Sequence, residues 1–380
     1  MLRVLQVVGV MNRGGAEVML MEILRNKPKD VQFDFLVNNP PSDLFKKGTF
    51  DDEIRSYGCQ IKYIGTQLRI GPLHYIKEFK KIVSELNPNI VHIHLNGKSG
   101  IIALAARLSG RRKIITHCHA NIKFRGHFLS KIFSELELFF QKFLISLFAT
   151  DWWGCSSDAN ARLYWPWIRK KSVVINNAID ISLYEKVDKQ KVDQLRRSYN
   201  LSEGTIVLGN VGRIVPQKNI KFVVDVIATL ASKGHKVAFI IAGRKEDSEY
   251  VNSTILHARE VGVEKSLIFL GERSDIPLLM YSFDVFVGPA LKEGFGMVAV
   301  EAQSAGTPSV LFKGFPKSVD MGLGLCSFIE DFNVETWADR IITSFQRGRL
   351  ENFDIIKRNI IENGFDAISN TKRIIELYRA

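Results

Sequence analysis

The stretch EGFGMVAVEAQSAGTPSVLF, residues 293–312, contains the pattern of one helix followed by one strand. Residues 297–305 are good helix formers, and Gly306 stands where helices commonly end. After a Thr-Pro turn, the apolar run 308–312 predicts a buried strand. A helix joined to a strand by so short a turn is the unit from which parallel sheets are built.

The same alternation runs through the whole chain. The first half has strand patterns at 3–10, 32–38, 90–95 and 113–119, with helical patterns at 16–26 and 100–110. The second half has strand patterns at 205–213, 236–243, 266–271 and 284–290, with a helical pattern at 220–234. We therefore predict an α/β fold of two doubly wound domains, 1–180 and 181–364, with the polar stretch 181–203 as the linker region.

Composition fits a cytosolic protein of two domains. The chain has 380 residues, of which 46% are hydrophobic, and no apolar run reaches the ~18 residues of a membrane span. The N-terminal run MLRVLQVVGV is interpreted as a strand and not as a signal peptide. The four cysteines are scattered without a CxxC pair, which favours reduced thiols.

Positive charge is concentrated in the first half. Residues 1–180 hold 26 Lys and Arg against 15 Asp and Glu, a net charge of +11, whereas residues 181–380 carry a net charge of +1. Such a half-molecule indicates an anionic partner, such as nucleic acid, anionic lipid or a phosphorylated substrate. A surface that only promotes solubility is the alternative.

Two carboxylates stand eight positions apart in the opening stretch. Glu293 precedes the predicted helix, beside Gly294 and Gly296, and Glu301 lies inside it. An acid–base pair must flank one reacting bond, but here one carboxylate is on a loop and the other on a rigid helix. The spacing favours two carboxylates that each hold hydroxyl groups of one ligand.

This stretch resembles the E-x7-E signature of the family 4 retaining glycosyltransferases, and the similarity extends over most of the chain. GNVGRIVPQKNI (209–220), NNAID (176–180), NRGGAE (12–17), THCHAN (116–121) and the segment 271–296 are similar to other segments of that family. The resemblance implies the GT-B fold, in which two Rossmann-like domains face each other with the active site in the cleft between them. It also implies that the C-terminal helix, at about 365–380, packs back on the first domain.

The resemblance assigns roles to the second half. Arg213 and Lys218 are expected to hold the diphosphate of a nucleotide-sugar donor, where Arg offers a bidentate fork and Lys a point charge. Glu301 is expected to accept from the ribose hydroxyls. Glu293 is expected to hold hydroxyls of the transferred sugar, together with Gly294 and the amides of Phe295, Gly296 and Met297 at the helix N-terminus. No metal cofactor is expected, because fixed positive groups replace it.

Two loops of the first half complete the expected site. Gly14 and Gly15 open a helix and form a concavity compatible with phosphate, to which Arg13 adds charge. By resemblance, one histidine of THCHAN lies over the donor sugar, and His119 is favoured over His117. The two HxH pairs also raise a zinc hypothesis, but no acidic or Cys ligand is spaced with them, so His92 and His94 are interpreted as satisfied strand residues.

Two stretches raise the possibility of membrane contact. The apolar run 131–149 is interpreted as a core helix, and YWPWIRKK (164–171) mixes aromatic and basic residues as interfacial segments do. The resemblance implies a cytoplasmic enzyme, peripheral at the inner face of the plasma membrane. It is expected to transfer a sugar from a UDP- or GDP-sugar to a polyprenyl-diphosphate-linked or other glycan acceptor of bacterial capsule, exopolysaccharide or lipopolysaccharide synthesis.

One departure and two rival functions stay open at this point. After the strand 236–243, GRKED places Arg244 and Lys245 where the family often has a second glycine. A nucleotide-sugar epimerase or phosphorylase on the same fold is the alternative enzyme. A basic nucleic-acid-binding protein is the alternative of another class, although the interleaved aromatic pattern of such proteins is missing and no nucleic-acid partner is expected.

Overall fold

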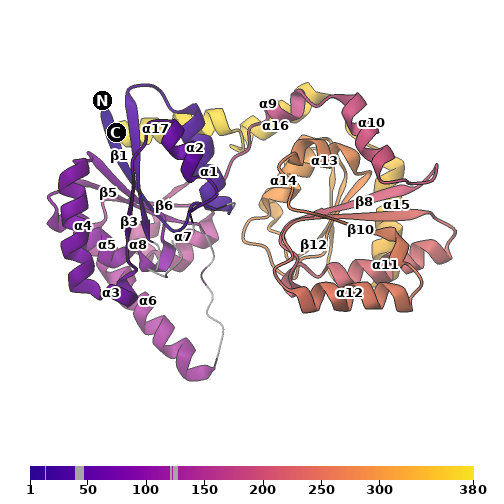
Figure 1. Ribbon diagram of the computed structural model, residues 1–380, viewed down its shortest axis with the longest axis horizontal. Helices are drawn as coiled ribbons and strands as arrows, with labels where there is room; N and C mark the ends of the chain where they lie inside the picture. The colour runs from indigo at the N-terminus through magenta and orange to yellow at the C-terminus, as the bar shows by residue number, and fades with distance from the viewer. Residues whose placement is uncertain (13, 39–46, 120–121, 123–126) are drawn as a thin grey trace. The chain divides into compact units, whose positions relative to one another are not determined.

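The computed structural model describes residues 1–12, 14–38, 47–119, 122 and 127–380. The chain forms two compact units. Unit 1 contains Met1–Ile179 and Ala367–Ala380, and unit 2 contains Asp180–Asp366. Figure 1 shows each unit as a sheet covered by helices.

Unit 1 is built on a seven-stranded sheet in the order β3-β2-β1-β4-β5-β6-β7, in which every neighbouring pair is parallel. The strands are β1 Leu2–Val8, β2 Val31–Asn38, β3 Ile61–Ile64, β4 Ile90–Ile93, β5 Lys113–Cys118, β6 Asp151–Gly154 and β7 Val173–Val174. The helices are α1 Gly15–Asn26, α2 Asp51–Ser56, α3 Gln67–Ile70, α4 Pro72–Leu86, α5 Ser99–Leu108, α6 Phe128–Phe148, α7 Ser157–Leu163, α8 Pro166–Arg169 and α17 Ala367–Arg379, with the 3-10 turn η1 at Asn96–Lys98.

Alternation along β1 sends side chains into two separate cores. Val4 and Val8 pack in a core with side chains of α1 and α17, whereas Leu5 and Val7 pack in a second core with α4 and α5. The sheet is therefore covered on both faces, as a parallel sheet requires. The C-terminal helix α17 is part of this arrangement because it packs against α1, with Ile374, Ile375 and Tyr378 buried.

Unit 2 repeats the plan with a six-stranded parallel sheet in the order β10-β9-β8-β11-β12-β13. Its strands are β8 Ile206–Val211, β9 Val237–Ala242, β10 Leu267–Gly271, β11 Val285–Gly288, β12 Ser309–Phe312 and β13 Cys326–Ile329. Its helices are α9 Ser182–Glu185, α10 Lys189–Ser198, α11 Ile220–Ser232, α12 Ser248–Glu260, α13 Ile276–Ser282, α14 Met297–Ser304, α15 Val334–Arg347 and α16 Phe353–Glu362, with 3-10 turns η2 Pro216–Lys218, η3 Glu264–Ser266 and η4 Lys317–Val319.

The two sheets share one strand order, and its reversal points to where ligands bind. Strand order changes direction between β1 and β4 in unit 1 and between β8 and β11 in unit 2. In open α/β sheets, ligands bind beyond the carboxyl ends of the strands at such a point. The predicted pair of doubly wound Rossmann-like domains is therefore confirmed, and the loops after these strands are the places to examine.

One sequence prediction is wrong, and a second segment is more regular than its composition suggests. The stretch 181–203, predicted as the linker region, contains α9 and all of α10, and it belongs to unit 2, where Tyr184 and Val192 are buried. The apolar run 131–149, predicted as a core helix, lies almost entirely in α6, but most of its large side chains face solvent. Of α6 only Leu138, Gln141, Leu144 and Ile145 are buried.

Candidate active site

The turn after β8 carries Arg213 and is held by a close backbone contact. Gly212 follows the strand with φ +149, and Gly243, after β9, has φ +148. A Cβ at position 243 would lie 1.8 Å from the carbonyl oxygen of Gly212. The two turns therefore pack backbone against backbone, which glycine at 243 permits.

Arg213 lies on the exposed side of this turn. Its guanidinium donates to the Glu246 carboxylate at 2.9 Å, and its side chain is 61% exposed. Arg244 donates to the same carboxylate and holds the pKa of Glu246 below its ordinary value. The departure GRKED thus supplies a second cation and its counter-ion beside Arg213. Sequence reasoning missed Arg244 and Glu246 as site residues, although a charge run directly after a strand was the available signal.

Lys218 and Glu293 form an ion pair that is largely shielded from solvent. The Lys218 ammonium donates to the Glu293 carboxylate, and the two side chains are only 16% and 11% exposed. The loop that carries Glu293 is tied to η2 because the Gln217 side chain donates to the carbonyl of Lys292 at 2.7 Å. The Glu293 amide donates to the carbonyl of Gly314 at 2.9 Å. The structure therefore brings two predicted site residues into direct contact on a fixed loop.

The N-terminus of α14 follows Glu293 directly. Gly294 is exposed, Phe295 is buried, and Gly296 has φ +89, a conformation that favours glycine. A Cβ on Gly296 would also lie 2.5 Å from the ring of Phe315. Met297 is the first helical residue, and amides at such a position have no acceptor within their own helix. The helix start thus provides backbone donors beside the ion pair.

Glu301 lies one turn further along α14 and differs from Glu293 in its surroundings. It is partly buried beside Tyr184, and burial raises the pKa of its carboxyl to about 7. Within the residues that the structure describes, no cation and no hydrogen-bond donor holds this carboxylate. It is a desolvated acceptor whose hydrogen-bonding capacity is unused.

His119 follows β5 in unit 1, where two contacts fix it. Its backbone amide donates to the side-chain oxygen of Asn96 at 2.6 Å, and its Nε2 lies 2.8 Å from Nδ1 of His94. Burial lowers the pKa of His119 to about 3, so the ring is neutral. Its Nδ1 is buried and has no hydrogen-bond partner in the described part of the chain.

The glycine loop after β1 is closed by an acidic side chain. Gly14 is the N-cap of α1 and Gly15 its first residue. A Cβ on Gly14 would lie 2.2 Å from a carboxylate oxygen of Glu17, so this carboxylate lies at the helix start. Burial raises the pKa of Glu17 above its ordinary value. A phosphate at this loop would have to displace Glu17. Arg13, predicted to add charge here, lies outside the described residues.

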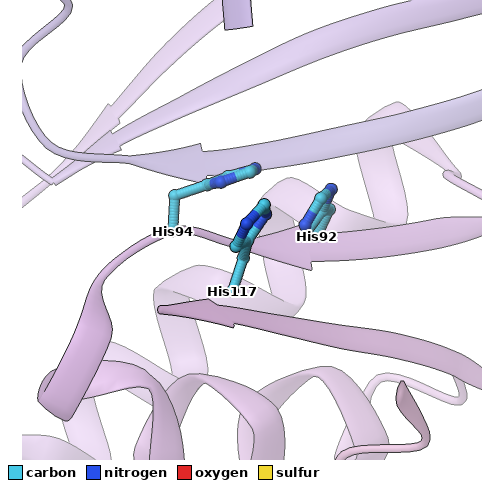
Figure 2. Close-up of side chains that lie close together, drawn as sticks. All are labelled: His92, His94 and His117. Carbon is cyan, nitrogen blue, oxygen red and sulfur yellow. The ribbon is translucent and has the colours of Figure 1, made fainter. Parts of the chain in front are cut away.

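The two HxH pairs meet on one face of the unit 1 sheet. His92, His94 and His117 lie side by side, and their candidate ligand nitrogens are within 4.8 Å of one another (Figure 2). The interpretation of His92 and His94 as satisfied residues is wrong for His92, whose Nε2 has no hydrogen-bond partner among the described residues. Sequence reasoning also missed Gln6 and Tyr378, which bond these rings from β1 and α17.

Each predicted residue of unit 2 thus lies in a loop at the carboxyl edge of its sheet or in α14. Lys218, Glu293 and the α14 amides form one cluster, and Arg213 forms a second with Arg244 and Glu246. In each cluster the cationic side chains are paired with a carboxylate. An incoming diphosphate, with more negative charge, can exchange with these carboxylates and take over the cations.

Comparison with protein-family models matches almost the whole chain. Residues 13–183 match the model described as Glycosyltransferase Family 4, and residues 191–363 match the model described as Glycosyl transferases group 1. The boundary between the two matches falls within α9 and α10.

Individual relatives agree with the family models. The chain is 32% identical to EpsF of Bacillus subtilis (strain 168), which is named as a glycosyltransferase, over 99% of this chain and 96% of EpsF. It is 26% identical to the UDP-Gal:alpha-D-GlcNAc-diphosphoundecaprenol alpha-1,3-galactosyltransferase of Escherichia coli, over 94% and 90% of the two chains. It is also 24% identical to the capsular polysaccharide biosynthesis glycosyltransferase CapH of Staphylococcus aureus, over 100% and 99%.

Solved structures with the same fold cover the full length. The crystal structure of Anabaena Alr3699/HepE in complex with UDP matches with a TM-score of 0.80 and 22% identity, over 100% of both chains. WaaG, a glycosyltransferase involved in lipopolysaccharide biosynthesis, matches with a TM-score of 0.67 and 15% identity, over 99% of both chains. These likenesses establish the fold.

Proposed function

Because this chain belongs to the family 4 glycosyltransferases with the GT-B fold, we propose that it transfers a sugar from a UDP-sugar to a lipid-linked glycan acceptor in bacterial surface polysaccharide synthesis. The glycosyltransferase activity follows from the family and from relatives such as CapH and EpsF. The nucleotide and the acceptor are inferred from the relatives that are named with UDP-galactose, UDP and a diphosphoundecaprenol acceptor.

The observation that carries the proposal is the contrast between Glu293 and Glu301. Glu293 is paired with Lys218, whereas Glu301, eight residues on, is desolvated and without a partner in the described residues. A carboxylate kept free in a partly buried place is suited to accept two hydroxyl hydrogen bonds, as from a ribose. A carboxylate beside a lysine and a helix start is suited to a polar sugar next to a diphosphate.

The chemistry then needs stabilisation of a departing nucleoside diphosphate. Lys218, Arg213 and the α14 amides supply fixed positive charge where the negative charge of the leaving group develops, which is the main catalytic contribution expected of such a site. Arg244 adds a third cation beside Arg213. Donor binding therefore needs no metal ion, and retention of configuration is the stereochemistry proposed from the family.

His119 is proposed to bind a hydroxyl of the transferred sugar. Its ring is bonded to His94 through Nε2, its backbone amide is bonded to Asn96, and its buried Nδ1 lacks a partner among the described residues. A neutral ring held at one nitrogen can orient a hydroxyl at the other without adding charge.

The acceptor proposal is supported by the exposed face of α6. Eight large apolar side chains of this helix are each about half exposed or more: Phe128, Leu129, Phe133, Leu136, Phe139, Phe140, Phe143 and Leu147. Figure 1 shows α6 extending beyond the body of unit 1. Of the helices in the described part of the chain, none combines the length and hydropathy that crossing a bilayer requires. An apolar face of this size on one helix fits a helix that lies in the membrane interface.

Aromatic and basic side chains continue this face. Trp165 stacks on Trp167 at 5.5 Å and contacts Phe139 edge to face, and the Lys142 ammonium lies 4.5 Å from the Trp165 ring centroid. Trp167 is 63% exposed and is followed by the basic run 169–171. Aromatic rings at headgroup depth and lysines beside anionic lipids are favourable arrangements. We place the enzyme at the cytoplasmic face of the membrane, where its lipid-linked acceptor would be presented.

The direct test measures transfer and donor binding together. Purified protein is incubated with radiolabelled UDP-glucose, UDP-galactose or UDP-N-acetylglucosamine, and with a synthetic polyprenyl-diphosphate sugar, in the presence of EDTA or Mg²⁺. Selective binding of one donor, unaffected by EDTA, and label transferred to the lipid would support the proposal. Release of free sugar, an epimerised donor, or phosphorolysis without transfer would favour the alternative enzymes. DNA binding that no nucleotide sugar alters would favour the nucleic-acid alternative. The relatives do not favour that alternative.

A further inference from the structure

Four histidines and a glutamine form a polar row inside the apolar core of unit 1. Gln6 of β1, His92 and His94 at β4, and His117 and His119 at β5 lie on the face of the sheet that α1 and α17 cover. Their neighbours on that face are apolar, among them Val4, Ile90, Ile115 and Trp153. Side chains of this polarity are rarely collected in a core without a reason.

Several ring nitrogens of this row are left without partners. His92, His94 and His117 are each at most 5% exposed. Nε2 of His92 and both ring nitrogens of His117 have no hydrogen-bond partner among the described residues. A buried donor or acceptor without a partner is unfavourable, so three such atoms in one place indicate that a ligand satisfies them.

The arrangement of the rings suits a small ion. The candidate nitrogens of His92, His94 and His117 lie within 4.8 Å of one another, and Figure 2 shows the three rings side by side. Zinc–imidazole bonds of 2.0–2.1 Å place tetrahedral ligand atoms about 3.3 Å apart. Separations of up to 4.8 Å exceed this value, so an ion would have to draw the three rings closer together.

The nitrogens that would not bind the ion are already held. Nδ1 of His92 lies 2.6 Å from the hydroxyl of Tyr378, and Nδ1 of His94 lies 2.8 Å from Nε2 of His119. Histidines that bind metals almost always donate their second N–H to an acceptor of this kind, which fixes the ring. Nε2 of His94 donates to the side-chain oxygen of Gln6 at 2.8 Å. An ion that replaced this proton would lie beside both atoms, so the Gln6 oxygen is the candidate for a fourth ligand.

We propose that His92, His94 and His117 bind a divalent transition-metal ion of the zinc type, with the amide oxygen of Gln6 completing the site. Imidazole ligands favour zinc and its neighbours over magnesium and calcium, which need carboxylate and water oxygens. The site belongs to the core of unit 1, whereas the cations that are proposed to hold the donor belong to unit 2. Its role is structural, because it joins β1, β4 and β5.

The test uses protein without a histidine tag, loaded with Zn²⁺ or Co²⁺ and freed of excess ion by gel filtration. We expect one ion per chain by elemental analysis, and an intense visible absorption of four-coordinate Co²⁺. His117→Ala and His92→Gln should abolish both signals. His74→Ala is the matched control, because His74 is an exposed histidine of α4, and it should bind as the wild type does.

Two results would overturn the proposal, and the first needs only the wild-type protein. It is wrong if wild-type chains retain far less than one Zn²⁺ or Co²⁺ per chain, whatever the variants do. It is also wrong if bound metal falls equally in His74→Ala and His117→Ala, because the ion would then be held at the surface. Circular dichroism of each variant establishes that a lost signal does not reflect an unfolded chain. Donor binding by unit 2 is measured in parallel, so that a failure of the metal site is distinguished from a failure of the proposed transferase site.

Discussion

The two units share a strand order but present opposite chemistry at the carboxyl ends of their strands. Unit 2 places ion pairs there, Lys218 with Glu293 and Arg213 with Glu246. At the end of β5, by contrast, unit 1 places neutral groups, with His119 bonded to His94 and Asn96. Yet the half of the chain that builds unit 1 carries the excess positive charge of the sequence. The excess positive charge of the sequence therefore does not coincide with the two clusters of cations and carboxylates, which lie in the half with a net charge of +1.

The largest effect on activity is expected from a substitution that breaks the ion pair of unit 2. Lys218→Ala should lower kcat/KM for the donor sugar by roughly 10²–10³-fold, as removal of one group that stabilises a leaving anion typically does. Initial rates at varied donor concentration measure this loss. Lys233→Ala is the matched control, because Lys233 is an exposed lysine of unit 2 that pairs with Glu335 and Asp339. If the Lys218→Ala enzyme kept the wild-type rate, the ion pair of unit 2 would have no part in donor binding or transfer.

The second prediction sharpens the role of the charge and apolar surface of unit 1. Replacing Phe133 of α6 by Ser should weaken binding to anionic vesicles by about 10–100-fold, because one exposed ring contributes about 1.5–3 kcal/mol when buried. Co-sedimentation with vesicles rich in phosphatidylglycerol measures this, and higher salt should weaken wild-type binding. Phe345→Ser, an exposed phenylalanine of α15 in unit 2, should bind as the wild type does. Equal losses in both variants would contradict a role for α6.

The third prediction uses the raised pKa of Glu301. Its folded-state pKa of about 7 lies above the ordinary value of 4.5, so ionisation destabilises the fold progressively from about pH 4.5 to 7 and fully above pH 7. Glu301→Gln should therefore stabilise the empty protein by about 1–3 kcal/mol at pH 8 and by much less at pH 5. Denaturant unfolding at both pH values measures the difference. A stabilisation independent of pH would show that ionisation of Glu301 is not its source.

Donor affinity should follow the same ionisation in the opposite sense. The carboxylate accepts ribose hydroxyls best when ionised, so wild-type donor binding should strengthen as pH rises through about 7. Glu301→Gln should bind the donor more weakly and lose this dependence. Calorimetric titration with UDP at pH 6 and pH 8 separates the two proteins.

The smallest effect concerns the neutral network of unit 1. Tyr378→Phe removes the hydroxyl that bonds His92 and Gln6, and should lower the free energy of unfolding by about 0.5–1.5 kcal/mol. Denaturant unfolding measures this, with Tyr57→Phe as the control at a half-exposed tyrosine of the same unit. An unchanged stability would mean that the network contributes little to unit 1.

The sequence patterns predicted the fold well, because hydrophobic periodicity and turn residues depend only on neighbouring positions in the sequence. Residues 297–305 predicted α14, and Gly306, with φ +70, lies just beyond its end. The pairing of Lys218 with Glu293 was not foreseen, because 75 residues separate them and only the sheet order brings their loops together. The exposure of α6 was missed for a related reason, since hydrophobicity does not say which face a neighbour covers.

The histidine row shows the same limit. Each HxH pair in the sequence shows that two rings share one face of a strand. The four rings come together only because β4 and β5 are adjacent in the sheet. Tyr378, 286 positions after His92, enters from the far end of the chain. No spacing in the sequence signals a contact of that kind.

The position of Tyr378 has a consequence for how the chain is made. The core of unit 1 includes Ile374, Ile375 and Tyr378, so this unit, although it is translated first, cannot close until the ribosome has passed its last strand by some 200 residues. All of unit 2 emerges in that interval and has its complete core available earlier. Synthesis thus runs from the first unit to the second, while completion runs in reverse, and a nascent chain that stalls late leaves an open apolar surface where α17 should lie.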